Sequence, residues 1–237
     1  MRAIVTGHSR GLGAAIAAEL VEAGAEVLAV SRRRSGAAGL REVALDLSDT
    51  AAVGDWLAGG ELANFLAGGT GPAILVNNAG MVEPIGPAGT NAPAAVAQAV
   101  ALNVAAPLML AEAMIAATAG LPDRRLCHIS SGAARKAYSG WSVYCATKAA
   151  LDHHARSVVE DALAGLRVES LAPGVIDTEM QGTIRATPAE RFSALDRFVA
   201  MKAEGALASP EAAAAAIVAH LLSEAFGTQP ATDIRDL

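Results

Sequence analysis

A tyrosine and a lysine stand four residues apart in the segment GWSVYCATK, residues 140–148. On a helix, this spacing brings Tyr144 and Lys148 over the same patch of surface. A phenol can donate a proton to the oxygen of a carbonyl group that is being reduced. An ammonium about 5 Å away, at an effective dielectric constant of about 20, favours the phenolate by about 3 kcal/mol. The pair therefore predicts a general acid whose pKa is lowered by about two units from its usual value near 10, and the alternative is a solvated surface pair.

A second candidate site is the glycine-rich turn TGHSRGLG, with Gly7, Gly11 and Gly13. The turn follows a short apolar run and precedes a segment with helical periodicity. Glycines permit a tight turn and a close approach of the backbone to a ligand. The first turn of the helix offers free N–H groups and a positive dipole end to a pyrophosphate. The motif predicts nucleotide binding, although a tight turn alone would also explain it.

Alternating apolar runs and helical patterns must position these two sites. β-branched or continuous apolar runs predict six strands, at 3–6, 26–30, 42–47, 72–80, 125–130 and 166–173. Helical patterns separate the strands, at 14–25, 49–67, 92–119 and 142–163. Parallel strands need crossover connections, so this order predicts one α/β domain over 1–237, with a doubly wound parallel sheet and helices on both faces.

The pattern changes after the sixth strand. Residues 174–186 are expected to form a loop, and Thr187 and Glu190 then form a capping box that predicts the start of a helix. A segment at this position lies where a lid would cover a ligand, so a substrate lid is expected around 175–207. Ser209 predicts the cap of the last helix, and the tail after that helix is left unassigned.

Composition excludes several classes of protein. The 237 residues carry a formal net charge of −6, which argues against a nucleic-acid or anionic-membrane partner. Cys127 and Cys145 provide neither a disulfide framework nor a metal-ligand spacing, and no metal site is expected. The first apolar run begins at the second residue, and glycines, prolines or charges interrupt every apolar stretch. We therefore expect a soluble, cytoplasmic protein without a membrane span.

The spacing T-G-x-x-x-G-x-G resembles the cofactor turn of the short-chain dehydrogenase/reductase family, which has a Rossmann fold. Further motifs of that family follow in order: NNAG at 77–80, Asn103 in the long helix, ISS at 129–131, Tyr144 thirteen residues after Ser131, Lys148, and PG-x-x-x-T at 173–178. The resemblance implies that Tyr144, Lys148, Ser131 and Asn103 are catalytic. Ser131 would hydrogen-bond the substrate oxygen, Lys148 the nicotinamide ribose, and Asn103 a water that connects the lysine to solvent.

The resemblance also implies a set of cofactor-binding residues: Gly7, Ser9, Arg10, Gly11, Leu12, Gly13, Ser31, Arg32, Arg33, Asp46, Leu47, Asn78, Ala79, Gly80, Tyr144, Lys148, Pro173, Gly174, Ile176 and Thr178. Ser31 stands where members that use NAD have an aspartate, and Arg32 and Arg33 follow it. Guanidinium groups pair with phosphate, so this strand end favours NADP(H), with a solvated basic run as the alternative. Asp46 resembles the residue that contacts adenine.

Short sequence segments narrow the expected substrate class. GW-x-x-YC-x-x-KAALD and APGVIDTEMQGTIR look like the sepiapterin reductase branch, and NNAGMVEPIGP looks like bacterial benzil reductases. Both groups reduce one carbonyl of a vicinal dicarbonyl. Trp141, Met180 and Asp233 are the expected substrate-pocket residues, and simple packing is the alternative for Trp141. The leading interpretation is an NADPH-dependent carbonyl reductase that forms a homodimer or homotetramer. An NAD-dependent alcohol dehydrogenase and a catalytically silent NADP(H)-binding regulator remain the alternatives.

Overall fold

The computed structural model describes residues 1–237 and contains one seven-stranded sheet in which all the paired strands run parallel, in the order β3-β2-β1-β4-β5-β6-β7. The strands are β1 (Arg2–Thr6), β2 (Glu26–Ser31), β3 (Leu40–Ala44), β4 (Ala73–Asn77), β5 (Arg124–Ile129), β6 (Leu166–Ala172) and β7 (Ala231–Asp233). Six of them confirm the predicted strands, and β7 comes from the tail that the sequence left unassigned.

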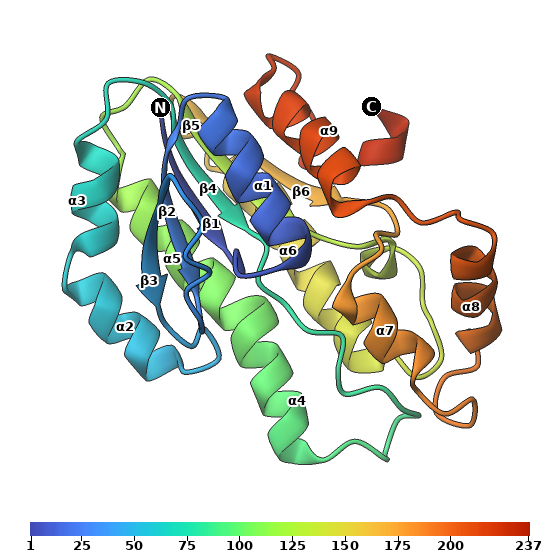
Figure 1. Cartoon of the computed structure of the whole chain (residues 1–237). Coiled ribbons are helices and arrows are strands. Elements are labelled where there is room, and N and C mark those ends of the chain that lie inside the picture. Colours follow the sequence, from blue (N-terminus) through green and yellow to red (C-terminus); the bar gives the residue numbers. More distant parts are fainter.

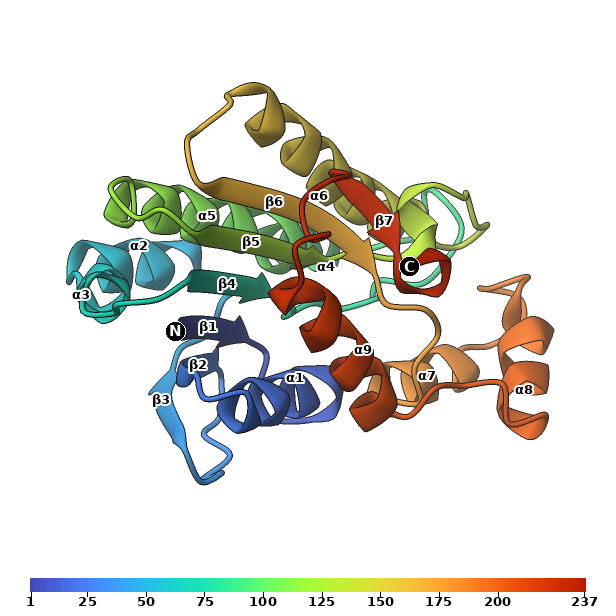
Figure 2. The ribbon, with the colours of Figure 1, turned by 90° about the horizontal axis from the view of Figure 1, so that it is seen from above.

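Helices cover both faces of the sheet, as Figures 1 and 2 show. One face carries α1 (Gly11–Glu22) and α9 (Pro210–Leu222). The other carries α2 (Thr50–Ala58), α3 (Glu61–Ala67), α5 (Ala106–Ala117) and α6 (Ser142–Glu160). Each face has its own hydrophobic core, and all five residues of β4 are buried between them. The predicted doubly wound α/β fold is confirmed.

The strand order reverses between β1 and β4, since β1 pairs with β2 on one side and with β4 on the other. In open α/β sheets, ligands bind outside the carboxyl ends of the strands at such a switch point. The glycine turn follows β1 and the NNAG motif follows β4. The fold thus brings the two motifs together at the carboxyl edge of the sheet.

One predicted helix is divided in two. The pattern over 49–67 forms α2 and α3, because Gly60 adopts a left-handed conformation at φ +76° between them. Asp49 caps α2, and its side chain accepts a hydrogen bond of 3.0 Å from the N–H of Ala52.

The segment after β6 differs from its prediction. The expected loop at 174–186 contains a helix, α7 (Glu179–Arg185), and the next helix, α8 (Leu195–Ala203), begins well after Thr187. Thr187 caps no helix, since its hydroxyl donates instead to the carbonyl of Thr183 at 3.0 Å. Residues 188–194 turn because Phe192 is fully buried in a cluster of aromatic side chains, a tertiary contact that overrides the local capping signal. Ser209 does cap α9, accepting from the N–H of Ala212 at 3.1 Å.

The prediction that no stretch could span a membrane was wrong as far as length and composition go. One helical run comprises α4 (Pro93–Val100), a π-helical turn (Ala101–Ala105) and α5. With 25 residues and a mean hydropathy of 1.8, it is long and apolar enough to cross a membrane. Leu110 and Met114 of this run pack fully into the core under the sheet. In all, 39% of the most apolar part of the run is buried inside the protein.

Candidate active site

The end of β5 and one face of α6 bring the expected catalytic side chains together. Tyr144 and Lys148 lie on α6, only 7% and 4% exposed. Lys148 Nζ donates to the carbonyl of Ile129 at 2.8 Å and lies 5.8 Å from the centre of the Tyr144 ring. Ser131, the residue that follows β5 and Ser130, lies beside the Tyr144 phenol and acts on its pKa. Buried Tyr144 and Lys148 and half-buried Ser131 therefore form one constellation.

The expected effect of the lysine on the tyrosine is not found. Burial raises the pKa of Tyr144 to about 12, and Ser131 only partly opposes the shift. Burial also lowers the pKa of Lys148 to about 8, while the charge of Asp152 raises it. Desolvation thus dominates the pKa of both groups, and Tyr144 keeps its proton at neutral pH.

Asn103 joins this constellation from a distorted helix. It lies in the π-helical turn between α4 and α5, a kind of turn that often occurs at functional sites. Its side chain is buried and bonds both main-chain groups of Met81: Oδ1 accepts at 2.9 Å and Nδ2 donates at 2.8 Å. A Cβ added to Gly80 would lie 3.3 Å from Asn103 Oδ1 and 3.6 Å from Lys148 Nζ. The NNAG turn, Asn103 and Lys148 therefore meet at one point.

The glycine turn is locked onto the NNAG turn. Asn78 Nδ2 donates to the carbonyl of Thr6 at 2.9 Å, and the Thr6 hydroxyl accepts from the N–H groups of Asn78 and Ala79, each at 2.9 Å. Gly13 must lack a side chain, because a Cβ there would lie 2.3 Å from both Asn78 Nδ2 and the Gly7 carbonyl. Close packing between the two turns fixes the position of the α1 amino end.

That amino end suits a phosphate ligand. No side chain caps α1, and its first turn carries no acidic residue. The first N–H groups of the helix thus remain available to an anion. Thr178, which begins α7, touches this turn, since a Cβ on Gly11 would lie 3.3 Å from its methyl group. The remaining residues expected around a cofactor line the same edge: Ser9 beside Gly7, and Pro173, Gly174 and Ile176 after β6.

The end of β2 presents positive charge. Ser31 carries no charge, and its hydroxyl donates to the Arg33 carbonyl at 2.6 Å. Arg32 and Arg33 are exposed and form no ion pair, so both guanidinium groups are free to meet a phosphate. Arg10 is different, since it pairs with Glu179 of α7. This ion pair links the glycine turn to the segment that the sequence predicts as a lid.

Three further residues expected around the cofactor have side chains that are buried or already hydrogen-bonded. Leu12 and Leu47 point into the two hydrophobic cores, so only their main-chain atoms can face a ligand. Asp46 accepts hydrogen bonds from the N–H and hydroxyl of Ser48, at 2.9 and 2.7 Å. Burial opposes ionisation of Asp46, but these hydrogen bonds and the charge of Arg32 lower its pKa.

An aromatic cluster lies beside Tyr144. Trp141 is 4% exposed and stacks on Phe192, with ring centres 4.6 Å apart and planes at 17°. Its ring also meets Phe198 of α8 at 5.3 Å and Tyr144, edge to face, at 5.4 Å. Met180 packs partly buried against this cluster. Phe192 and Phe198, which belong to the expected lid, therefore pack on Trp141.

Asp233, the third expected pocket residue, is not a free carboxylate. Arg235 binds it with two hydrogen bonds, from Nε at 2.8 Å and from an Nη at 2.6 Å. These hydrogen bonds from Arg235, with its charge, lower the pKa of Asp233. A ligand that used Asp233 would have to replace Arg235.

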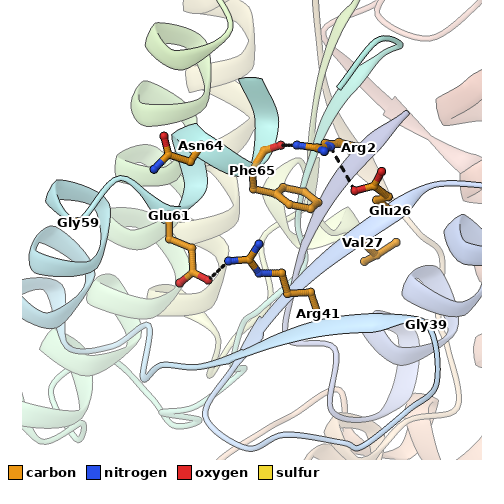
Figure 3. Close-up of a pocket in the computed structure, with 9 residues that line it drawn as sticks. All are labelled: Arg2, Glu26, Val27, Gly39, Arg41, Gly59, Glu61, Asn64 and Phe65. Carbon is orange, nitrogen blue, oxygen red and sulfur yellow. Dashed lines mark hydrogen bonds and ion pairs between the residues drawn. The ribbon is translucent and has the colours of Figure 1, made fainter. Parts of the chain in front are cut away.

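A hollow lies at the other edge of the sheet. It measures about 560 Å³ and is lined by residues at the amino ends of β1, β2 and β3 and by α3 (Figure 3). Its charges are paired within it: Arg2 contacts Glu26 at 3.3 Å, and Arg41 contacts Glu61 at 2.7 Å. Ser131, Tyr144 and Lys148 lie at the opposite, carboxyl edge.

Two histidine contacts were missed by sequence reasoning. His8, inside the glycine turn, bonds Glu42 at 2.7 Å. His154 of α6 is half-buried, and its Nδ1 lies 3.1 Å from Nε2 of the buried His128. For the first contact, the sequence shows only that a histidine stands in the glycine turn. Both contacts join residues more than 20 positions apart, so no local pattern reveals them.

Comparison with known proteins agrees with this geometry. A family model for short chain dehydrogenases matches residues 1–189. The benzil reductase ((S)-benzoin forming) of Bacillus cereus is 36% identical over 239 residues, 94% of each chain. The sepiapterin reductase of Xenopus laevis is 34% identical, covering 82% of this chain and 81% of its own. A crystal structure of a short-chain dehydrogenase/reductase from Burkholderia vietnamiensis is 49% identical, with a TM-score of 0.71 over 100% of this chain and 97% of its own.

Proposed function

We propose, because this chain belongs to the short-chain dehydrogenase/reductase family, that it is an NADPH-dependent carbonyl reductase that acts on a small vicinal dicarbonyl. Its relatives include benzil and sepiapterin reductases, which confirms the resemblance read from the motifs. Members of the family are oxidoreductases that bind NAD(P)(H). The observation that carries the proposal is the constellation of Ser131 with the buried Tyr144 and Lys148, beside Asn103.

In this proposal Tyr144 donates the proton to the substrate oxygen. Its pKa of about 12 means that the phenol carries that proton throughout the neutral range. Ser131 hydrogen-bonds the same oxygen and stabilises the negative charge that develops on it. Bound NADPH supplies the hydride. Lys148 holds the nicotinamide ribose, and Asn103 holds a water on the path from Lys148 to solvent.

The choice of NADPH rests on charge at the end of β2. No carboxylate stands there to bind a ribose hydroxyl, because the position is Ser31. Arg32 and Arg33 are unpaired and would bind a 2′-phosphate in a charge-assisted way. The uncapped amino end of α1 would receive the pyrophosphate. We also assign Asp46 and Leu47 to the adenine side.

The substrate class rests on the relatives and on the aromatic cluster. We assign Trp141 and Met180 to the apolar wall of the pocket, and residues 175–207 to a lid. Trp141 stacks on Phe192 of that segment, so the lid closes over Tyr144 by aromatic packing. A pterin anchored by Asp233 is less favoured, because Arg235 already occupies that carboxylate. A flat diketone such as benzil needs no such anchor.

Assembly and localisation also belong to this proposal. Val100 of α4 and Val159 of α6 are 43% and 39% exposed, and they lie on helices that cover one face of the sheet. We expect these helices to form the contact of a homodimer or homotetramer, which light scattering coupled to size exclusion would measure. Cys127 and Cys145 are unpaired, which suits the reducing cytoplasm.

The test is NADPH oxidation at 340 nm by the purified protein with benzil, 1-phenyl-1,2-propanedione, sepiapterin and simple ketones. A parallel series uses NADH, and a reverse series uses alcohols with NAD⁺. We expect turnover of the dicarbonyls with NADPH, abolished by Tyr144→Phe. Faster alcohol oxidation with NAD⁺ would instead favour the dehydrogenase alternative. Tight NADPH binding without turnover of any carbonyl or alcohol would favour the silent regulator.

A further inference from the structure

We propose that His8 and Glu42 hold the loop between β2 and β3 in the position that selects the 2′-phosphate of NADPH. We call the set of His8, Ser35, Gly36 and Glu42 the clasp. This inference rests on the proposed function, because it explains how that cofactor site distinguishes NADPH from NADH. His8 and Glu42 act through the loop and are positioning residues; neither needs to touch the cofactor.

Four hydrogen bonds to the Glu42 carboxylate hold the clasp together. Glu42 Oε1 bonds His8 Nε2 at 2.7 Å and accepts from the N–H and hydroxyl of Ser35, both at 2.6 Å. Glu42 Oε2 accepts from the N–H of Gly36 at 2.9 Å. A single side chain on β3 thus connects the glycine turn after β1 with the loop after β2.

The clasp is shielded from solvent on the side of the glycine turn. His8 is fully buried, and 10% of the Glu42 side chain is exposed. The hydrogen bonds from Ser35 lower the pKa of Glu42 to about 2, although partial burial opposes the shift. Glu42 is therefore a carboxylate at every pH at which the enzyme would work, and the clasp stays closed.

Few contacts besides the clasp hold the loop. Residues 32–39 are exposed, and the main chain of 32–38 makes no hydrogen bond to other main-chain groups. The Ser31 hydroxyl holds the start of the loop by its bond to the Arg33 carbonyl at 2.6 Å. A hollow of about 80 Å³ lies beneath the loop, with His8, Ala37 and Ala38 in its wall. The middle of the loop therefore does not rest on a packed surface, and Glu42 is its main anchor.

This arrangement fixes two ligand-binding elements relative to each other. His8 immediately follows Gly7, in the turn expected to hold the pyrophosphate. Arg32 and Arg33 begin the loop and face solvent without ion partners. A loop that is already ordered loses less conformational entropy when its arginines bind a phosphate. The benefit goes to the ligand that carries a 2′-phosphate, because NADH has nothing for these arginines to bind.

The experiment measures cofactor affinity without turnover. Fluorescence titration gives Kd values for NADPH and NADH, and calorimetry gives Kd values for 2′,5′-ADP and 5′-AMP. The variants are Glu42→Gln, His8→Phe and Ser35→Ala, the last of which removes one hydroxyl only. Glu61→Gln is the matched control, because that glutamate also pairs with neighbours at the surface but lies at the opposite edge of the sheet.

We expect Glu42→Gln and His8→Phe to weaken NADPH and 2′,5′-ADP about tenfold and Ser35→Ala about threefold. NADH and 5′-AMP should change less than twofold, and Glu61→Gln should change nothing. Equal losses for NADPH and NADH, or no loss for either, would overturn the inference. A wild-type protein that binds NADH as well as NADPH would overturn the cofactor assignment and this inference together. If the wild-type protein prefers NADPH but the variants do not change that preference, only this inference is overturned and the proposed function stands.

Discussion

Lys148 and Asp152 lie one turn apart on α6, and both are buried, at 4% and 2% exposure. Asp152 Oδ1 accepts hydrogen bonds from the hydroxyls of Ser130 and Ser170, at 2.6 and 2.8 Å. Its Oδ2 accepts from Arg135 Nε at 2.9 Å. Burial lowers the pKa of Lys148 to about 8, and Asp152 is the charge that opposes this shift. Asp152 thus helps to keep Lys148 protonated at neutral pH.

The pH dependence of activity should follow Lys148. Because its pKa is about 8, kcat/KM should fall as the pH rises through about 8 and the ammonium loses its proton. Asp152→Asn removes the charge that raises this pKa, so the fall should move to lower pH by about one unit. Rates measured from pH 6 to 10 test this, with Glu160→Gln, an exposed carboxylate on the same helix, as control. An unchanged profile in Asp152→Asn would contradict it.

The pair of Arg10 with Glu179 should compete with the cofactor. Both side chains are exposed, at 62% and 67%, so the pair contributes little to stability. Glu179→Gln releases the Arg10 guanidinium, and NADPH should bind about two- to fivefold more tightly at low salt, the range expected for an exposed ion pair. The effect should shrink as salt is added. Glu190→Gln on the same segment is the control, and weaker binding in Glu179→Gln would contradict the prediction.

Loss of the Phe192 ring should release the proposed lid. Phe192 is fully buried and stacks on Trp141, so Phe192→Ala should destabilise this docking by about 3–5 kcal/mol. We expect faster trypsin cleavage after Arg185 and Arg197, and a higher KM for the dicarbonyl with little change in NADPH affinity. Val199→Ala, at a position 46% exposed on α8, should behave as wild type. Unaltered proteolysis would show that other contacts hold the segment.

Glu169 should anchor the carboxyl-terminal strand. It is fully buried in β6 and bonds His220 of α9 at 3.0 Å, the N–H of Gly227 at 3.0 Å, and the hydroxyl of Thr232 in β7. Glu169→Ala leaves these partners unsatisfied, so the free energy of unfolding should fall by about 3–5 kcal/mol. Urea denaturation measures the loss. Glu169→Gln keeps part of the bonding and should lose less, and a loss below about 1 kcal/mol in Glu169→Ala would contradict this account.

The strands and the two turns after β1 and β4 were predictable because their signals are local. Apolar runs identify buried parallel strands, and the glycines are required by close contacts within the turn itself, as at Gly13. The helix boundaries around 174–194 were not predictable. Thr187 and Glu190 form a capping pattern, but burying Phe192 against Trp141 contributes more free energy than a cap.

The spacing of Tyr144 and Lys148 predicted that they lie together, yet the direction of the pKa shift of Tyr144 was predicted wrongly. The sequence places Lys148 one turn from Tyr144, which favours a lower pKa for the phenol. It does not show that both groups are almost fully buried, and burial raises the pKa of Tyr144 instead. The clasp was missed for a related reason, since Glu42 and His8 are 34 residues apart and meet only when β3 joins the sheet.

The hollow at the amino ends of the strands makes it possible to attach the protein to a support without covering Tyr144 and the proposed cofactor site. Asn64 is exposed in the wall of that hollow (Figure 3). A thiol introduced by Asn64→Cys would point the cofactor edge into solution. Cys127 is buried and would not react, so only the partly exposed Cys145 would need replacement. An enzyme immobilised in this orientation should keep its activity, whereas random coupling through Lys136 or Lys202 would also attach it by the lid side.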